Sequence, residues 1–229
     1  MYTMLTQQQA QQFAFENQTI VDNVLKEHYQ IYILDELYKS NFGNNLVFKG
    51  GTALKLAYNS IRYSEDLDFS ILNNINYVDF KKNIESIVNK FSGSRIQDIY
   101  NKYNTLYAKI VFSIDFKPIP IGIKIEINKN KKNIDFRHSI GLLKSSFNNI
   151  EIVAKVFTLE AILKDKIEML EGGIRRQPRD LFDAWYICQK LNQNFEIKEK
   201  YKYSKKELMD GLNPLLPKTY QKVMELFKI

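Results

Sequence analysis

The feature that most constrains this chain is the stretch of residues 48–70, which joins a pair of glycines to two alternating carboxylates. Lys49-Gly50-Gly51-Thr52 is followed, after thirteen residues, by Asp66-Leu67-Asp68-Phe69. The glycines come after a short apolar run and before a helical pattern, so they predict a strand, a tight turn and a helix. The acids alternate with Leu67 and Phe69, which predicts a strand whose two acids project from the same face.

These two features together suit a phosphate group and a divalent cation. A glycine turn at the start of a helix lets the backbone approach a ligand closely and offers free amides to a phosphate. Two carboxylates on one strand face repel each other, and a hard cation bound to their oxygens relieves that repulsion. Either feature alone is common in ordinary turns and surface strands. Their combination favours a site for a nucleoside triphosphate (NTP) and Mg²⁺ or Mn²⁺.

Composition narrows the class of protein. The 229 residues are 45% hydrophobic, enough for a substantial core, and the single cysteine, Cys188, cannot form an internal disulfide. The N-terminus has no basic segment before an apolar run, and no apolar stretch reaches the ~18 residues that span a bilayer. We therefore expect a cytoplasmic protein with no membrane segment. The net charge of +7 agrees with a polyanionic partner, although charge alone is weak evidence for one.

The order of the periodic segments predicts an α+β fold, in which a mixed β-sheet flanked by helices is followed by a C-terminal helical bundle. Strands are expected at residues 46–48, 67–72, 105–116 and 121–128, and a short apolar run lies at 150–153. Helices are expected at residues 6–38 (one or two), 52–58, 78–91, 159–170, 179–191, 205–212 and 217–227. The pattern divides the chain into an α/β domain at 1–155 and a helical domain at 156–229. No linker rich in glycine or serine separates them, so we expect the two parts to share an interface.

Two blocks of sequence resemble a known family. The runs Phe48-Lys49-Gly50-Gly51-Thr52-Ala53-Leu54 and Arg62-Tyr63-Ser64-Glu65-Asp66-Leu67-Asp68-Phe69 resemble nucleotidyltransferases of the DNA polymerase β type. More narrowly, they are similar to the AbiEii abortive-infection toxins, which include the mycobacterial MenT toxins. Asp165-Lys166 and Arg179-Asp180-Leu181-Phe182-Asp183 are similar to the C-terminal motifs of that family. The resemblance covers about residues 46–190 and implies a nucleotidyltransferase-type sheet.

The resemblance also implies roles for the acidic residues. Asp66 and Asp68 would hold the catalytic metal ions, and the superfamily usually adds a third carboxylate from a later strand. Glu126 is the candidate, because Lys124 and Glu126 share the face opposite Ile123, Ile125 and Ile127. Asp115 is the competing third acid.

The remaining site residues are assigned in the same way. Nucleotide binding would involve Lys49, Gly50, Gly51, Thr52, Arg62, Ser64 and Lys166. Lys166 would contact the triphosphate as a compact cation, and Asp180 would complete the catalytic set or position Lys166 or Arg179. The sequence leaves open whether Asp180 or its neighbour Asp183 has that role.

Together these assignments describe a magnesium-dependent enzyme that transfers a nucleoside monophosphate (NMP) from an NTP to an acceptor hydroxyl. By resemblance, the acceptor would be RNA, at a tRNA 3′ end, and the protein would be the toxin of a toxin–antitoxin system with a cognate antitoxin. Five C-terminal lysines form a candidate RNA surface, namely Lys198, Lys200, Lys202, Lys205 and Lys206. The alternatives are a nucleotidyltransferase that acts on a small molecule or a protein side chain, and a nucleotide-binding regulator without catalysis.

Overall fold

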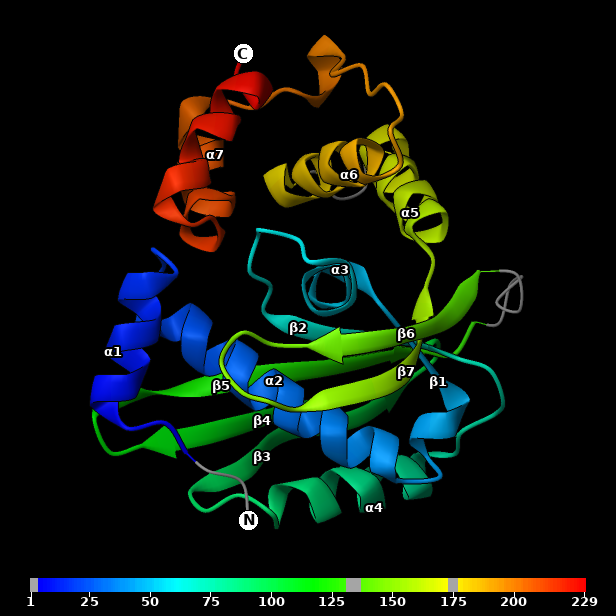
Figure 1. Cartoon of the computed structure of the whole chain (residues 1–229). Coiled ribbons are helices and arrows are strands. Elements are labelled where there is room, and N and C mark those ends of the chain that lie inside the picture. Colours follow the sequence, from blue (N-terminus) through cyan, green and yellow to red (C-terminus); the bar gives the residue numbers. More distant parts are fainter. Residues whose placement is uncertain (1–3, 131–136, 173–176) are drawn as a thin grey trace.

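A computed structural model describes residues 4–130, 137–172 and 177–229, and within them seven strands form one mixed sheet. The sheet lies against helices, and the C-terminal helices gather beyond it (Figure 1). The predicted α+β class is therefore confirmed.

The strands are β1 (Leu46–Lys49), β2 (Asp66–Ile71), β3 (Ser94–Lys102), β4 (Thr105–Ile114), β5 (Lys117–Asn128), β6 (His138–Lys144) and β7 (Glu151–Phe157). The α-helices are α1 (Gln7–Glu16), α2 (Val21–Lys39), α3 (Gly50–Tyr58), α4 (Tyr77–Val88), α5 (Leu159–Gly172), α6 (Pro178–Lys190) and α7 (Lys205–Gly211). The 3₁₀ helices are η1 (Gly43–Asn45), η3 (Glu199–Tyr201), η4 (Asn213–Leu215) and η5 (Lys218–Phe227).

The sheet has the order β3-β4-β5-β2-β1-β7-β6, with β2 parallel to β5 and antiparallel to β1. The main apolar core lies on the face covered by α2 and α4, where side chains such as Tyr29, Ile33 and Phe80 pack against inward residues of the strands. From residue 121 onward the isoleucines of β5 are buried, whereas Lys124 and Glu126 lie on the other face. The alternation expected for this strand is therefore confirmed.

Two strands, β3 and β6, were not predicted. β3 carries polar residues at most positions and is mostly exposed, because it pairs with β4 at one end of the sheet order, so it has little apolar periodicity. β5 also begins earlier than expected, at Lys117, and includes Pro118 and Pro120. The parallel pairing with β2 starts only at Lys124, so the prolines occupy a stretch where no amide is needed on that side.

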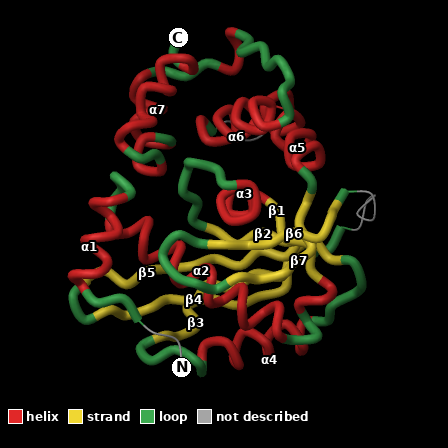
Figure 2. The backbone as a smooth tube through the Cα atoms, viewed as in Figure 1, coloured by secondary structure: helices red, strands yellow, loops and turns green. Residues whose placement is uncertain are grey.

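The C-terminal helices pack on the α3 side of the sheet, as Figure 2 shows. The Tyr186 hydroxyl on α6 donates to the carbonyls of Tyr58 and Asn59 at the end of α3, and the Tyr63 amide donates to the Leu215 carbonyl. These contacts join the two predicted domains through α3. Residue 155, the predicted boundary, lies within β7. In the described ranges, no helix has the length and apolar character needed to cross a membrane.

Candidate active site

The register of the sheet brings the predicted carboxylates into one row. Lys49 at the end of β1 lies opposite Asp68 on β2, and Asp68 lies opposite Glu126 on β5. Residues directly opposite each other on neighbouring strands point to the same face, so the Asp68 and Glu126 side chains leave the same face of the sheet. The two strands are ~4.8 Å apart. Asp66 lies one pleat away on that face, with Lys124 as its partner on β5 and an Nζ–Oδ1 distance of 3.7 Å.

The glycine turn is closely packed against this row. Gly50 has a φ of +80°, which favours glycine, and a β-carbon there would lie 2.5 Å from Oδ2 of Asp68. A β-carbon on Gly51 would lie 2.3 Å from Nη2 of Arg62 and 2.7 Å from Oγ of Ser64. The first turn of α3 therefore presents its amides beside the carboxylates without intervening side chains.

A cleft of about 240 Å³ opens at this point. The start of α3 and the strands β2 and β5 line one side of it, and helices α5 and α6 line the other. It is lined by ten of the eleven predicted site residues: Lys49, Gly50, Gly51, Arg62, Ser64, Asp66, Asp68, Glu126, Lys166 and Asp180. Thr52 is the exception, since it is buried and its hydroxyl donates to the Asp66 carbonyl. Asp115 lies in the β4–β5 turn, away from the cleft, which favours Glu126 as the third acid.

The carboxylates of the cleft interact strongly. Burial and the negative charges of Asp66 and Glu126 raise the pKa of Asp68 to about 6, and the nearby cations Lys49 and Lys166 reduce the rise. Burial lowers the pKa of Lys49, against the opposing effect of Asp165 and Asp68. The cleft thus holds closely spaced acids that favour a cation.

Behind the cleft lies a buried chain of alternating charges. The Nε and Nη2 atoms of Arg62 donate to the two oxygens of Asp183, each at 2.8 Å, and Nη1 donates to the Tyr63 carbonyl at 2.7 Å. Lys166 Nζ lies 2.8 Å from Asp183 Oδ2 and 2.6 Å from Asp180 Oδ1. Oδ2 of Asp180 is buried and has no hydrogen-bond partner among the residues that the structure describes.

This geometry separates the two acids that the sequence left open. Asp183 is fully buried and bridges Arg62 to Lys166, whereas Asp180 lines the cleft. Burial alone would lower the pKa of Lys166, but Asp183 and Asp180 outweigh it and raise that pKa. Lys166 is therefore a fixed cation in the wall of the cleft.

Four lining residues had no predicted role, namely Ile162, Asp165, Met169 and Arg179. Asp165 accepts a hydrogen bond from Arg137, whose guanidinium also lies 4.8 Å from the Phe157 ring centroid. Spacings of three and four residues place Ile162, Lys166 and Met169 on one face of α5. That periodicity was readable in the sequence, but the pairing with Arg137 depends on the fold.

The donor set of the cleft fits magnesium. Asp66, Asp68 and Glu126 supply only oxygen atoms, which this ion prefers. Across the described parts of the chain, no three acidic, histidine or cysteine side chains gather closely enough to enclose a metal ion. In enzymes that act on nucleotides, substrate phosphates supply further oxygen ligands to Mg²⁺ beside those of the protein.

Comparison with known protein families gives the family of the chain. The profile described as "Nucleotidyl transferase AbiEii toxin, Type IV TA system" matches residues 32–220. The chain belongs to the AbiEii nucleotidyltransferase toxin family. This AbiEii protein is therefore a nucleotidyltransferase of a family of type IV toxin–antitoxin systems, as the resemblance implied.

Solved structures of similar fold support the architecture of this AbiEii protein. MenT4, a nucleotidyltransferase toxin from Mycobacterium tuberculosis, has a TM-score of 0.58 and 16% identity, covering 98% of this chain and 89% of MenT4. JHP933 from Helicobacter pylori also has a TM-score of 0.58, with 21% identity over 78% of this chain and 71% of JHP933. A search of curated proteins found no significant match.

Proposed function

We propose that this AbiEii protein is a magnesium-dependent enzyme that transfers NMP from an NTP to the 3′ hydroxyl of an RNA, with tRNA as the acceptor, and releases pyrophosphate. The observation that carries the proposal is the row in which Asp68 and Glu126 lie opposite each other beside the Gly50-Gly51 turn. Acids and phosphate-binding amides then face one cleft.

The β- and γ-phosphates would lie at the start of α3. The amides of Gly50 and Gly51 would offer their partial positive charge to these phosphates, and Ser64 and Lys49 line the same cleft. Lys166 adds a fixed positive charge on the opposite wall. Phosphoryl chemistry depends mainly on positioning and charge stabilisation, which these groups supply.

Arg62 would act through its neighbours. All three guanidinium nitrogens donate to protein oxygens, and the side chain is only 2% exposed. It therefore holds Asp183, and through it Lys166, in place, and it supports the backbone at Gly51. Asp180 orients Lys166 through Oδ1, and its Oδ2, which has no partner among the described residues, would accept a hydrogen bond in the cleft.

Asp66, Asp68 and Glu126 would hold magnesium against the triphosphate. When bound, the ion neutralises phosphate charge and favours ionisation of the attacking hydroxyl. All three carboxylates lie on one face of the sheet, so the reacting groups would meet on that face. As a toxin of this family, the protein would have a cognate antitoxin as its partner.

Incorporation of labelled nucleotide tests the proposal. Purified protein is incubated with Mg²⁺, each α-labelled NTP in turn and total cellular tRNA, beside Asp66→Asn and Asp68→Asn variants and a reaction with EDTA. We expect label in tRNA with the intact protein and magnesium only. Glu151→Gln, an exposed substitution on β7, is the matched control. If label enters a protein or a small molecule and none enters tRNA, tRNA is not the acceptor.

A further inference from the structure

The row of site residues extends across the sheet beyond the cleft and ends in a pair of tyrosines. Glu126 on β5 lies opposite Tyr107 on β4, and Tyr107 lies opposite Tyr100 on β3. Lys49, Asp68, Glu126, Tyr107 and Tyr100 therefore occupy successive strands on one face of the sheet. The two tyrosines are one and two strand spacings from the third carboxylate.

The geometry of the pair suits stacking. The two rings are nearly parallel, at 8°, with centroids 4.5 Å apart, and both side chains are partly exposed. Each ring of a stacked pair has one outer face on which a further group can lie, and Lys102 Nζ lies over the Tyr100 ring. The pKa of Tyr107 is raised by burial and by Tyr100, with smaller contributions from Asp98, Glu126 and Asp66. The Tyr107 hydroxyl thus lies within electrostatic reach of the cleft.

Basic side chains share this face. Lys124 lies opposite Lys109, which in turn lies opposite Asp98. The Lys109 side chain extends over β5, since its Cε is 3.0 Å from where a Gly122 β-carbon would lie. Lys109, two residues from Tyr107 on β4, also lines a hollow of about 450 Å³ together with Arg95. At the turn, Lys102 Nζ lies 4.8 Å from the Tyr100 ring centroid.

We propose that this face of β3, β4 and β5 binds the unpaired end of the RNA acceptor, with bases stacked on Tyr107 and Tyr100 and phosphates along Lys124 and Lys109. Stacking on aromatic rings beside a basic groove is the usual way in which proteins hold single-stranded nucleic acid without sequence preference. The inference rests on the proposed function, because it assigns the acceptor of that reaction.

The in-line geometry of the reaction indicates that the tyrosines bind the RNA acceptor rather than the base of the NTP. In a displacement at the α-phosphorus, the attacking and leaving oxygens lie roughly in line. The leaving pyrophosphate would lie at the glycine turn after β1, on one side of the carboxylates. The tyrosines lie on the other side, on β4 and β3, where the attacking 3′ hydroxyl has to arrive.

Three of the five lysines in the C-terminal cluster are paired with acids, as Lys124 is paired with Asp66 on the sheet face. Lys198 and Lys200 both pair with Glu171, and Lys202 Nζ lies 2.5 Å from a Glu199 oxygen. Hydrogen bonds from Lys200 and Tyr201 help to lower the pKa of Glu171 to about 2, so this acid stays charged. These pairs reduce the positive charge that the cluster offers to phosphate.

Binding of RNA without turnover tests the inference. The affinity of the full chain for a fluorescein-labelled 12-nucleotide single-stranded RNA is measured by anisotropy in the absence of NTP. We expect Tyr107→Leu to weaken binding by about tenfold, since each stacked base contributes ~1–3 kcal/mol. Tyr107→Phe keeps the ring and is expected to stay within about twofold of the wild type.

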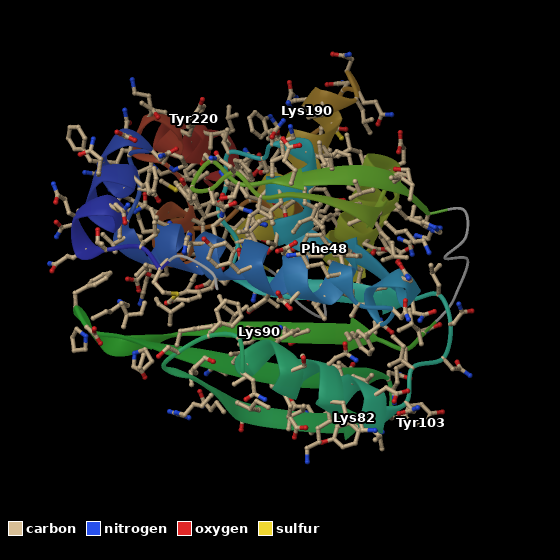
Figure 3. The ribbon with its side chains drawn as sticks, turned by 60° about the horizontal axis from the view of Figure 1, so that its bottom comes forward. Phe48, Lys82, Lys90, Tyr103, Lys190 and Tyr220 are labelled. Atoms are coloured by element: carbon tan, nitrogen blue, oxygen red, sulfur yellow. The ribbon has the colours of Figure 1, made fainter. Side chains whose placement is uncertain are left out.

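Tyr220→Leu is the matched control, because Tyr220 is an exposed tyrosine on η5, on the opposite side of the molecule from the Tyr103 turn of β3 and β4 (Figure 3). Circular dichroism and thermal unfolding check that each variant folds. Equal RNA affinity in Tyr107→Leu and Tyr220→Leu, or no RNA binding by the wild type, would overturn the inference. In a parallel titration with a fluorescent NTP in place of RNA, a loss of affinity in Tyr107→Leu confined to the NTP would also overturn it, because it would assign the rings to the base of the NTP.

The outcomes of this test distinguish an error in the stacking site from an error in the proposed reaction. Transfer to tRNA with RNA binding that does not depend on Tyr107 would overturn the stacking site alone. Binding of RNA through Tyr107 without transfer to tRNA would overturn the proposed reaction alone.

Discussion

A β-carbon on Gly50 would lie 2.5 Å from Oδ2 of Asp68. This distance is shorter than any van der Waals contact, so the Asp68 carboxylate would have to move to make room for a side chain at residue 50. The backbone that would bind phosphate and the acid that would bind metal are thus in direct contact. A change in one displaces the other.

Gly50→Ala is expected to reduce NMP transfer by about a hundredfold, because displacement of a reacting group by ~1 Å costs this much. The substitution also strains a backbone with positive φ. The control is Gly172→Ala at the end of α5, where a β-carbon meets nothing within 4 Å among the described residues. Initial rates for both purified variants check the prediction, and similar rates would contradict it.

Asp183→Ala is expected to lower the free energy of unfolding by about 3–5 kcal/mol, because it leaves the buried Arg62 charge without its carboxylate. The matched change is Glu151→Ala, whose partner Lys144 lies 2.5 Å away but whose side chain is 55% exposed. Exposed pairs contribute about 1 kcal/mol or less. Urea unfolding of the two variants measures the difference, and equal losses would refute the role given to the buried pair.

Glu126→Gln is expected to abolish most NMP transfer, whereas Asp115→Asn keeps the wild-type rate. Glu126 lines the cleft opposite Asp68, while Asp115 lies in the exposed β4–β5 turn. Rates measured at saturating Mg²⁺ and over a Mg²⁺ titration check this. A large loss in Asp115→Asn with a normal rate in Glu126→Gln would reverse the assignment of the third acid.

Glu27 on α2 is expected to make the free energy of unfolding depend on pH. Burial raises its pKa above 4.5, although Lys55 and a hydrogen bond from Ser145 reduce the rise. The folded state therefore binds this proton more tightly than the unfolded state, so stability falls as pH rises from about 4.5 through the raised pKa. Glu27→Gln keeps an oxygen for Ser145 but has no charge to bury.

The free energy of unfolding of Glu27→Gln, relative to the wild type, should thus increase as pH rises above about 4.5. Urea unfolding in steps from about pH 4 to 7.5 measures this difference. Two curves that run parallel over the whole range would show that the Glu27 carboxyl titrates alike in the folded and unfolded states.

Much of the cleft was predictable because its residues obey local rules. Asp66 and Asp68 are two residues apart on a strand, and Gly50 and Gly51 mark a turn, so spacing alone brought each pair together. The contact between the two pairs depends on the antiparallel register of β1 and β2. The family resemblance, rather than periodicity, supplied that link.

Other features could not be read from spacing. Arg62 and Asp183 are 121 positions apart, and only the packing of α6 against the end of α3 brings them together. Thr52 was expected to face the nucleotide, but its hydroxyl donates to the β2 backbone. β3 escaped prediction because a largely exposed strand has no apolar alternation, and with it the Tyr100–Tyr107 pair was missed.

The most direct test of the account is to measure two products of one reaction, with Mg²⁺, RNA and an NTP labelled at the α-phosphate. The account predicts that label enters RNA in an amount equal to the pyrophosphate released, and that Asp68→Asn loses both together. Release of inorganic phosphate in place of pyrophosphate, or undiminished labelling by Asp68→Asn, would contradict nucleotidyl transfer at this cleft.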